Sequence, residues 1–237
     1  MTRPFIVCNM ITSINGKIVG KFWYDNEVGA RGLALYNEKH FYRNPNGYMS
    51  GSITAAKLCG EHEMDLRENV PPQPREDHVV MDNAECYYVA LDVEGTIPWA
   101  SNTVEYAGRP ASHVIELLTE DVSDAYIDFL NRRNVSYIFC GKKKDAASMT
   151  MAAEKLYSLF HVTVLKCGGG GGLNWAFQRE GLIDELSIFM TPITDGNSDS
   201  PSIFERRSLP DEGTFEFKLE AVEVVENDYL WLRYLKK

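Results

Sequence analysis

Five consecutive glycines, Gly168 to Gly172, form the part of the sequence best suited to bind an anion. A strand-like apolar run over 160–165 precedes them, and good helix formers follow from Leu173 to Glu180. Glycine lets the backbone approach a ligand closely. The first N–H groups of a helix, with the positive end of its dipole, point at whatever lies there. Strand, glycine loop and helix start together predict a site for a phosphate or pyrophosphate.

A flexible linker is the alternative interpretation of this glycine run. Linkers are usually Gly/Ser-rich over longer stretches with polar flanks, whereas this run lies between two apolar segments. The run also departs from the common phosphate motifs. G-x-G-x-x-G would need a glycine at Leu173, and a P-loop would end in Gly-Lys-Ser/Thr. The segment is therefore a phosphate loop of another type, or not a phosphate loop.

A second group of polar side chains follows the predicted strand over 5–11. Ser13, Asn15 and Lys17 lie around an Asn-Gly pair, which is typical of a tight turn. Binding groups gather in the loops at strand ends of α/β folds. The three side chains are thus candidates to project into a cleft, and a plain hairpin turn is the alternative.

A third candidate is the pattern Gly51-x-x-Thr54, where a short strand over 47–54 is predicted to turn into a helix. The start of that helix offers a second N-terminal anion site, with the Thr54 hydroxyl in the first turn. The pattern is short, so it supports a site only together with other segments.

Strands and helices are predicted to alternate along the chain, which favours an α/β fold with a mostly parallel central sheet flanked by helices. The other predicted strands cover 87–92, 112–118, 135–141 and 186–194, and the predicted helices cover 27–43, 123–133, 149–160 and 173–180. Residues 215–225 and 229–234 predict a C-terminal antiparallel hairpin, and the polar, Pro-rich stretch over about 60–80 predicts a long surface excursion. Without repeats or a clear linker, residues 1–237 are predicted to form a single domain.

Composition limits the classes of partner. The net charge of −10 at pH 7 disfavours nucleic acid and anionic membranes. The N-terminus has no apolar signal-like region, and no apolar run reaches spanning length. Five cysteines, an odd number without a C-x-x-C pair, indicate reduced thiols rather than a disulfide frame or a zinc site. We therefore expect a cytoplasmic protein without a metal ion.

Taken in order, these segments resemble one known family. Besides the three candidate segments, the sequence carries Gly181-Leu182-Ile183-Asp184-Glu185 before a strand that ends near Pro192. The order is similar to that in the C-terminal reductase domain of the bifunctional riboflavin-biosynthesis deaminase/reductase and its stand-alone relatives. The resemblance extends from about Phe5 to about Phe204 and implies a dihydrofolate reductase-like fold. No deaminase motif is present in this chain.

The resemblance implies NADPH-dependent reduction of 5-amino-6-(5-phosphoribosylamino)uracil, a ribosylaminopyrimidine, in a homodimer. Lys17 would be the catalytic residue, polarising the open-chain imine or carbonyl of the ribose while the nicotinamide delivers hydride. The substrate-binding residues implied are Ser13, Asn15 and Lys17. The cofactor-binding residues implied are Gly51, Thr54, Gly169, Gly170, Gly171, Gly172, Leu173 and Asn174. The preference for NADPH over NADH comes from the family, with 142–144, three lysines, as candidates to bind the 2′-phosphate.

Some positions depart from the family pattern on the substrate side. Asn15 stands where the family has Asp, and Cys167 or Gly168 stands where it has Glu. Leu58 replaces an Asp after the G-x-x-T pattern. Cofactor binding is therefore better supported than the identity of the substrate. The alternatives are a dihydrofolate reductase-like enzyme acting on a pterin or another small substrate, and a nucleotide-binding protein without turnover.

Overall fold

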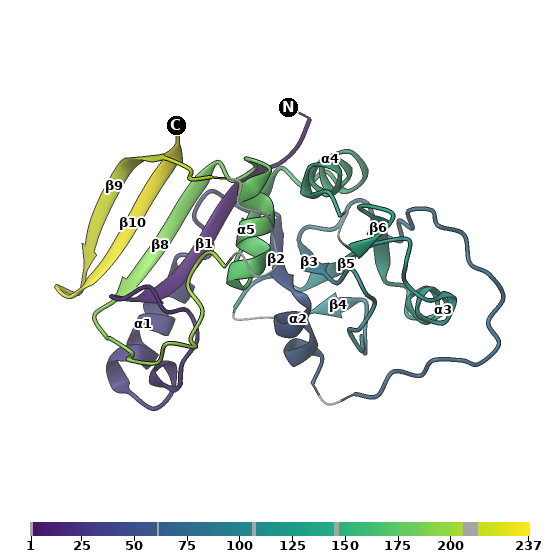
Figure 1. The fold of residues 1–237 in the computed structure, drawn as a ribbon, viewed down its shortest axis with the longest axis horizontal. Helices are drawn as coiled ribbons and strands as arrows, with labels where there is room; N and C mark the ends of the chain where they lie inside the picture. Colours follow the sequence, from purple (N-terminus) through teal and green to yellow (C-terminus); the bar gives the residue numbers. More distant parts are fainter. Residues whose placement is uncertain (1, 61, 106–107, 145–146, 206–212) are drawn as a thin grey trace. The chain divides into compact units, whose positions relative to one another are not determined.

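The computed structural model of the chain describes residues 2–60, 62–105, 108–144, 147–205 and 213–237 (Figure 1). Contacts divide the chain into two compact units. The first comprises residues 45–165 with the N-terminal residues up to Pro4, and the second comprises 5–44 and 166–237. Each unit contains strands and helices of its own. That the 237 residues form one reductase domain stays a prediction.

The first unit contains a parallel sheet in the order β2, β3, β5, β6, and a short β4 lies antiparallel to β5. The strands are β2 (Gly47–Gly51), β3 (Tyr87–Leu91), β4 (Thr103–Val104), β5 (Ser112–Leu118) and β6 (Ser136–Phe139). Every residue of β5 is buried, as expected for a strand covered on both faces. The helices are α2 (Ser52–Cys59), α3 (Asp124–Arg132) and α4 (Met149–Phe160).

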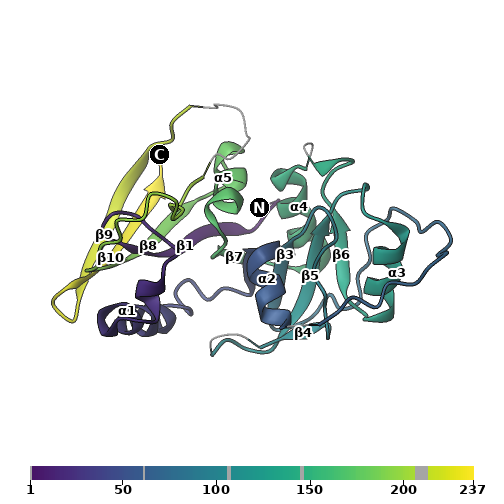
Figure 2. The same cartoon turned by 60° about the horizontal axis from the view of Figure 1, so that its bottom comes forward.

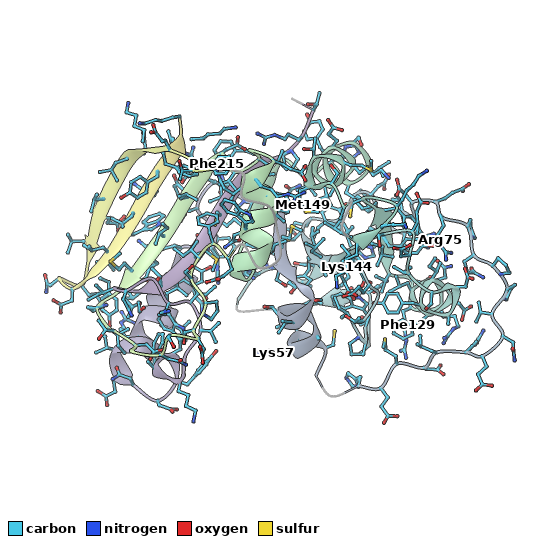
Figure 3. The ribbon with its side chains drawn as sticks, in the orientation of Figure 1. Lys57, Arg75, Phe129, Lys144, Met149 and Phe215 are labelled. Atoms are coloured by element: carbon cyan, nitrogen blue, oxygen red, sulfur yellow. The ribbon has the colours of Figure 1, made fainter. Side chains whose placement is uncertain are left out.

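Helix α3 shows why these segments are helical. The Ser123 side chain caps its N-terminus by accepting a hydrogen bond from the Tyr126 backbone N–H. Tyr126, Phe129 and Leu130 recur at helical spacing on its buried face. They join one apolar core with strand residues such as Leu118, and Phe129 is labelled in Figure 3.

The same core encloses a carboxyl group. Glu116 on β5 is fully buried, accepting hydrogen bonds from Trp99 Nε1 at 2.8 Å and from the Tyr126 hydroxyl at 2.7 Å. Burial, followed by the nearby Asp92 carboxylate, raises the pKa of Glu116 well above its ordinary value. The folded state therefore binds a proton here more tightly than the unfolded chain does.

We expect Glu116→Gln to flatten the dependence of stability on pH. The pKa of Glu116 is higher in the folded than in the unfolded protein. Its contribution to the free energy of unfolding is therefore fully present below the unfolded pKa, near 4.5, and is lost as pH rises toward the folded pKa. Glutamine has the same shape and does not ionise. The free energy of unfolding of the variant relative to wild type should thus increase with pH, by about 1.4 kcal/mol for each unit of the pKa shift.

Urea unfolding at several pH values from 4 to 8 measures this difference, with the exposed Glu120→Gln as a charge-matched control. If the free energy of unfolding changed with pH in the same way for wild type and Glu116→Gln, Glu116 would be ionised in the folded protein.

Between α2 and β3 the described residues form no helix or named strand, and the surface excursion over about 60–80 stays a prediction. Its later part is tied to the first unit. The Asp77 carboxylate accepts hydrogen bonds from the Phe139 backbone N–H and from Lys155 Nζ, both at 2.9 Å. His78 forms an isolated bridge with Tyr137 and stacks on its ring.

The second unit contains a mixed sheet in the order β1, β8, β10, β9. Strands β1 (Phe5–Ser13) and β8 (Glu185–Thr191) are parallel, whereas β10 (Tyr229–Lys236) is antiparallel to both β8 and β9 (Phe217–Val225). Helix α1 (Glu27–Glu38) lies on one face, as Figures 1 and 2 show. A short 3-10 helix (Lys21–Trp23) precedes it, and α5 (Gly171–Arg179) belongs to the same unit.

The α/β fold, its flanking helices and the C-terminal hairpin are confirmed, and the sheets contain both parallel and antiparallel pairs. The three largest errors concern the ends of α1 and β8 and the approach to the glycines. Helix α1 ends at Glu38 rather than at residue 43, because Lys39 leaves the helical conformation with φ of −87° and ψ of 8°. Strand β8 ends at Thr191 rather than at residue 194.

The third error concerns the approach to the glycines. Phe160 ends α4, and His161 caps it with a left-handed φ of 55°, so the strand predicted over 160–165 is instead β7 (Val164–Cys167). Helix α5 begins at Gly171 and not at Leu173. Two of the five glycines therefore belong to the helix. None of the described helices has the length and apolar character that a membrane crossing requires.

Candidate functional site

The turn after β1 holds the three residues predicted to face a substrate. Gly16 has a φ of 81°, and the Ser13 N–H donates to the Lys17 carbonyl at 3.0 Å, so the Asn-Gly turn is as tight as predicted. The buried Ser13 hydroxyl donates to Asn15 Oδ1 at 2.8 Å and accepts from the Lys17 N–H at 2.9 Å. Ser13 thus shapes the turn from inside, while Asn15 is exposed and Lys17 is half-buried.

Residues 195–205, which we call the bridging segment, contact this turn over its whole width. Asn15 Nδ2 donates to the Asp195 carbonyl at 2.6 Å, and the Asp195 N–H donates back to Asn15 Oδ1 at 3.3 Å. Lys17 Nζ donates to the Ser200 carbonyl at 2.8 Å, and Lys17 forms an antiparallel bridge with Ser202.

The other end of the bridging segment packs on the start of α5. The Glu205 N–H donates to the Gly171 carbonyl at 3.1 Å, and Asn174 Nδ2 donates to the Ile203 carbonyl at 2.8 Å. A Cβ atom at Gly171 would lie 2.6 Å from the Ser202 carbonyl oxygen, so only glycine fits there. Within the second unit, the bridging segment therefore contacts both the turn that holds Ser13, Asn15 and Lys17 and the start of the glycine helix α5.

The glycines of the run differ in whether a side chain would fit at their positions. Gly169 makes room for Leu173, whose Cδ2 would lie 2.0 Å from a Cβ at that position. Gly170 and Gly172 are exposed, and a Cβ on either would meet no atom within 4 Å. The open backbone is thus at Gly170 and Gly172, where a ligand can approach it. Because the Leu173 side chain is buried, the part of Leu173 available to a ligand is its backbone N–H.

Asn174 is fully buried, and its Oδ1 accepts no hydrogen bond from any described residue. A buried polar oxygen without a donor costs free energy unless water or a ligand supplies one. The side chain thus ties the bridging segment to α5 through its nitrogen and leaves its oxygen as an acceptor.

The helix N-termini fall into two groups. Side chains cap α1 (Asn26), α3 (Ser123) and α4 (Ser148) by accepting backbone N–H bonds. In contrast, α2 and α5 begin after Gly51 and Gly170, and no side chain among the described residues caps either. Uncapped N–H groups at the positive end of a helix dipole are acceptor-seeking groups that an anion satisfies.

In the first unit, α2 presents such an end by itself. A Cβ at Gly51 would meet nothing within 4 Å, so the backbone there is open. Thr54 lies in the first turn, is half-buried, and its hydroxyl has no hydrogen bond to the parts of the chain that the structure describes. Gly51 and Thr54 stay predicted cofactor contacts in this unit.

The residues of the α5 end suit a dinucleotide cofactor. A diphosphate needs several convergent N–H donors and room to approach the main chain. The first turn of α5 supplies N–H groups from Gly171, Gly172 and Leu173, and the exposed Gly170 leaves the approach open.

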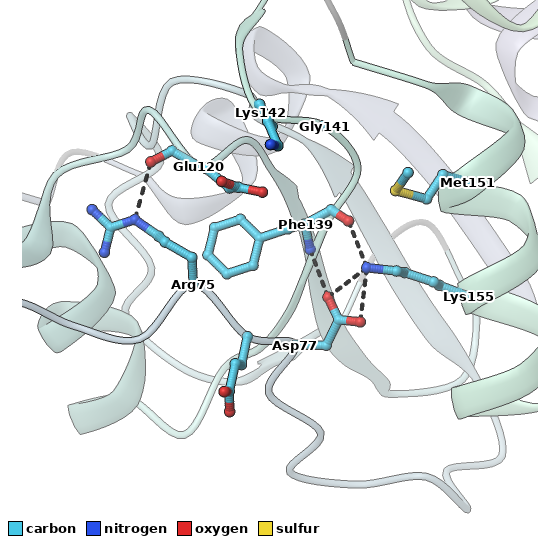
Figure 4. A pocket seen from close by; sticks show the side chains of 9 residues that line it. Arg75, Asp77, Glu120, Phe139, Gly141, Lys142, Met151 and Lys155 are labelled. Carbon is cyan, nitrogen blue, oxygen red and sulfur yellow. Dashed lines mark hydrogen bonds and ion pairs between the residues drawn. The ribbon is translucent and has the colours of Figure 1, made fainter.

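A separate pocket of about 600 Å³ lies in the first unit (Figure 4). Two of its cations are already engaged: Arg75 Nε donates to the Glu120 carbonyl at 3.0 Å, and Lys155 pairs with Asp77. Lys142 also lines it, while Lys144 pairs with Glu94 at 2.7 Å. The contacts of Arg75 and Asp77 connect the excursion to the rest of the first unit. Within the described ranges, no three His, Cys, Asp or Glu side chains gather as metal ligands.

Sequence reasoning missed the bridging segment, including Asp195, Ser200 and Glu205. The only local signals were an Asp-Gly pair and a Ser-Pro pair, which indicate turns and no ligand chemistry. All three contact the turn or α5 through their own main-chain groups, which no sequence pattern identifies.

The chain has an α/β fold with a helix that begins in glycines, and comparisons with known proteins show which family it resembles. Residues 139–231 match the family model described as RibD C-terminal domain. The resemblance to the riboflavin-biosynthesis reductase family predicted from the sequence is thereby confirmed.

Solved structures of the same fold cover the chain. RibD from Acinetobacter baumannii has 16% identity and a TM-score of 0.64, covering 100% of this chain and 59% of its own. A pyrimidine reductase-like protein from Corynebacterium diphtheriae has 16% identity and a TM-score of 0.64, with 99% and 92% covered. A riboflavin biosynthesis reductase from Saccharomyces cerevisiae has 13% identity and a TM-score of 0.62, with 100% and 91% covered. The chain thus spans 59% of the length of the Acinetobacter RibD.

Proposed function

We propose that this protein is an NADPH-dependent reductase that transfers hydride to the ribose carbon of 5-amino-6-(5-phosphoribosylamino)uracil. The observation that carries the proposal is the open, uncapped glycine start of α5, joined through the bridging segment to the turn that holds Lys17. The family match over 139–231 supports the class of reaction.

In this proposal the N–H groups of Gly171, Gly172 and Leu173 bind the cofactor diphosphate, with Gly169 and Gly170 shaping the approach. The buried Asn174 keeps the helix start in place through its bond to the Ile203 carbonyl. Gly51 and Thr54 at α2 are further proposed cofactor contacts. When bound, the reduced nicotinamide supplies the hydride, so the protein contributes positioning and electrostatics.

Lys17 is the proposed catalytic residue. Its ammonium group, on a half-buried side chain at the end of β1, is suited to polarise the open-chain imine or carbonyl of the substrate. Ser13 and Asn15 are the proposed substrate-side residues. Both polar atoms of the Asn15 side chain already contact Asp195, so Asn15 is less available to bind a substrate. The second candidate is therefore a reductase that acts on another small substrate, such as a pterin or a carbonyl compound.

Consumption of NADPH tests the proposal. We expect the absorbance band of NADPH to disappear when the ribosylaminopyrimidine is added to the protein. Consumption only with a pterin or a simple carbonyl compound would select the second candidate. Cofactor that raises the melting temperature without being consumed by any of these substrates would instead indicate a nucleotide-binding protein without turnover.

We also propose that the protein acts as a homodimer in the cytoplasm. Val222 and Val224 on β9 are 51% and 61% exposed and lie opposite Leu232 and Leu230, so one face of the hairpin is apolar and open. A second copy of the chain would cover this face. Light scattering gives the mass in solution, and a monomer at micromolar concentration would contradict the dimer. The five free cysteines fit a reducing compartment, which cell fractionation tests.

A further inference from the structure

The ammonium group of Lys17 is held by a chain of contacts that begins at Asp195. Lys17 Nζ donates to the Ser200 carbonyl at 2.8 Å. The hydroxyl of the same Ser200, a residue only 8% exposed, donates to Asp195 Oδ2 at 3.0 Å. The carbonyl that accepts from Lys17 thus belongs to a residue whose side chain is fixed by a carboxylate.

Asp195 uses its whole side chain to close this part of the bridging segment. Its Oδ1 accepts from the Asn197 N–H at 3.0 Å, while Oδ2 accepts from Ser200. The intervening residues 196–199 are exposed, so no packed core fixes their path. The geometry of residues 195–200 therefore depends on these two hydrogen bonds and on one from the Asp199 N–H to Asn197 Oδ1 at 2.9 Å.

The backbone of Asp195 is anchored to the turn that carries Lys17. Asn15 binds both the carbonyl and the N–H of Asp195, at 2.6 Å and 3.3 Å, and the Ile18 N–H donates to the Pro201 carbonyl at 3.0 Å. The backbone is thus anchored on both sides of Ser200, at Asp195 and at Pro201. Between these two anchors, the Asp195 carboxylate holds the side chain of the residue whose carbonyl accepts from Lys17.

A lysine side chain has four rotatable carbon–carbon torsions, and its ammonium group occupies a single position only when an acceptor is fixed. We propose that Asp195 is a positioning residue which, through the Ser200 hydroxyl, orients the Ser200 carbonyl and so places the Lys17 ammonium group. This inference rests on the proposed function for the catalytic consequence, whereas the placement itself is a property of the protein alone.

Competitive labelling of amines with acetic anhydride, followed by mass spectrometry of the peptides, measures the placement without cofactor or substrate. In Asp195→Ala, we expect Lys17 to be acetylated roughly fivefold faster than in wild type, as the loss of one net hydrogen bond implies. The exposed Lys218 on β9 serves as the internal standard. Asp195→Asn keeps one acceptor oxygen and should restore most of the protection.

Asp199→Ala is the matched control, because it removes the same charge from the same segment. Asp199 Oδ1 accepts only a long 3.4 Å bond from Ser198. We expect wild-type labelling of Lys17 in this variant. Ser200→Ala, which removes the hydroxyl and keeps the carbonyl, should reproduce Asp195→Ala and should not add to it in the double variant.

In turnover, Asp195→Ala should lower kcat about tenfold with unchanged NADPH affinity, and Asp195→Asn should recover most of the loss. Lys17 labelling that is equal in wild type, Asp195→Ala and Ser200→Ala would overturn the proposal. Faster labelling in a protein that reduces no candidate substrate would uphold the placement and refute the proposed function instead.

Discussion

Gly170→Asp is expected to weaken NADPH binding about tenfold to a hundredfold while the fold becomes more stable. Gly170 is the N-cap of α5, with φ of −71° and ψ of 168°, a backbone that any residue adopts. A Cβ there meets nothing within 4 Å. The carboxylate of an aspartate would accept hydrogen bonds from the N–H groups of the first turn. It would also place a negative charge where the diphosphate is proposed to lie.

The opposite signs of the two effects make this substitution informative. Capping should add roughly a few tenths of a kcal/mol to the free energy of unfolding, and the charge at the positive end of the helix dipole about 0.3–1 kcal/mol more. A variant at least as stable as wild type rules out misfolding as the cause of weaker binding. Gly170→Asn is the matched control, since it has the same shape and capping ability without the charge. Calorimetric titration with NADPH and thermal unfolding measure both quantities. A stable Gly170→Asp variant with wild-type affinity would remove α5 from the cofactor site.

Lys17→Met is expected to lower kcat by about a hundredfold and to leave the dissociation constant of NADPH near the wild-type value. Methionine keeps the length and apolar stem of lysine but loses the charge that would stabilise the developing negative charge on the substrate. The Lys17 ammonium group donates to the carbonyl of Ser200, which belongs to the bridging segment and not to the glycine helix. Its removal should therefore affect the chemical step more than the cofactor.

Single-turnover rates with saturating NADPH, together with cofactor titration, separate these two effects. Lys17→Arg is the control that keeps the charge and a donor for the Ser200 carbonyl, so it should retain more activity than Lys17→Met. A fall in NADPH affinity with an unchanged rate would place Lys17 on the cofactor side.

Local patterns were sufficient to predict most elements. Ser123 and Ser148 precede their helices as side-chain caps, and the helix over 149–160 was predicted with the bounds that the structure has. Both strands of the C-terminal hairpin and the Asn-Gly turn after β1 also follow from short-range rules. These features depend on neighbouring residues only, so the sequence displays their causes directly.

The boundaries of helices and strands were predicted wrongly where the backbone conformation depended on a single residue. Thr163 and Val164 donate their N–H groups to Asn46, more than a hundred residues earlier in the chain, and the strand starts there rather than at Phe160. His161 ends α4 in a left-handed conformation that histidine adopts less readily than glycine or asparagine. Apolar character alone could not separate the end of the helix from the start of the strand.

The sequence by itself determined the α/β pattern, the open glycine run and the polar turn that carries Lys17. Only the tertiary structure decided that one segment joins that turn to the glycine helix. Asn15 and Asp195 lie 180 positions apart, and Lys17 and Ser200 lie 183 apart. The acceptors at Ser200, Ile203 and Gly171 are main-chain carbonyls. Every residue has such a carbonyl, so its role depends on where the folded chain places it.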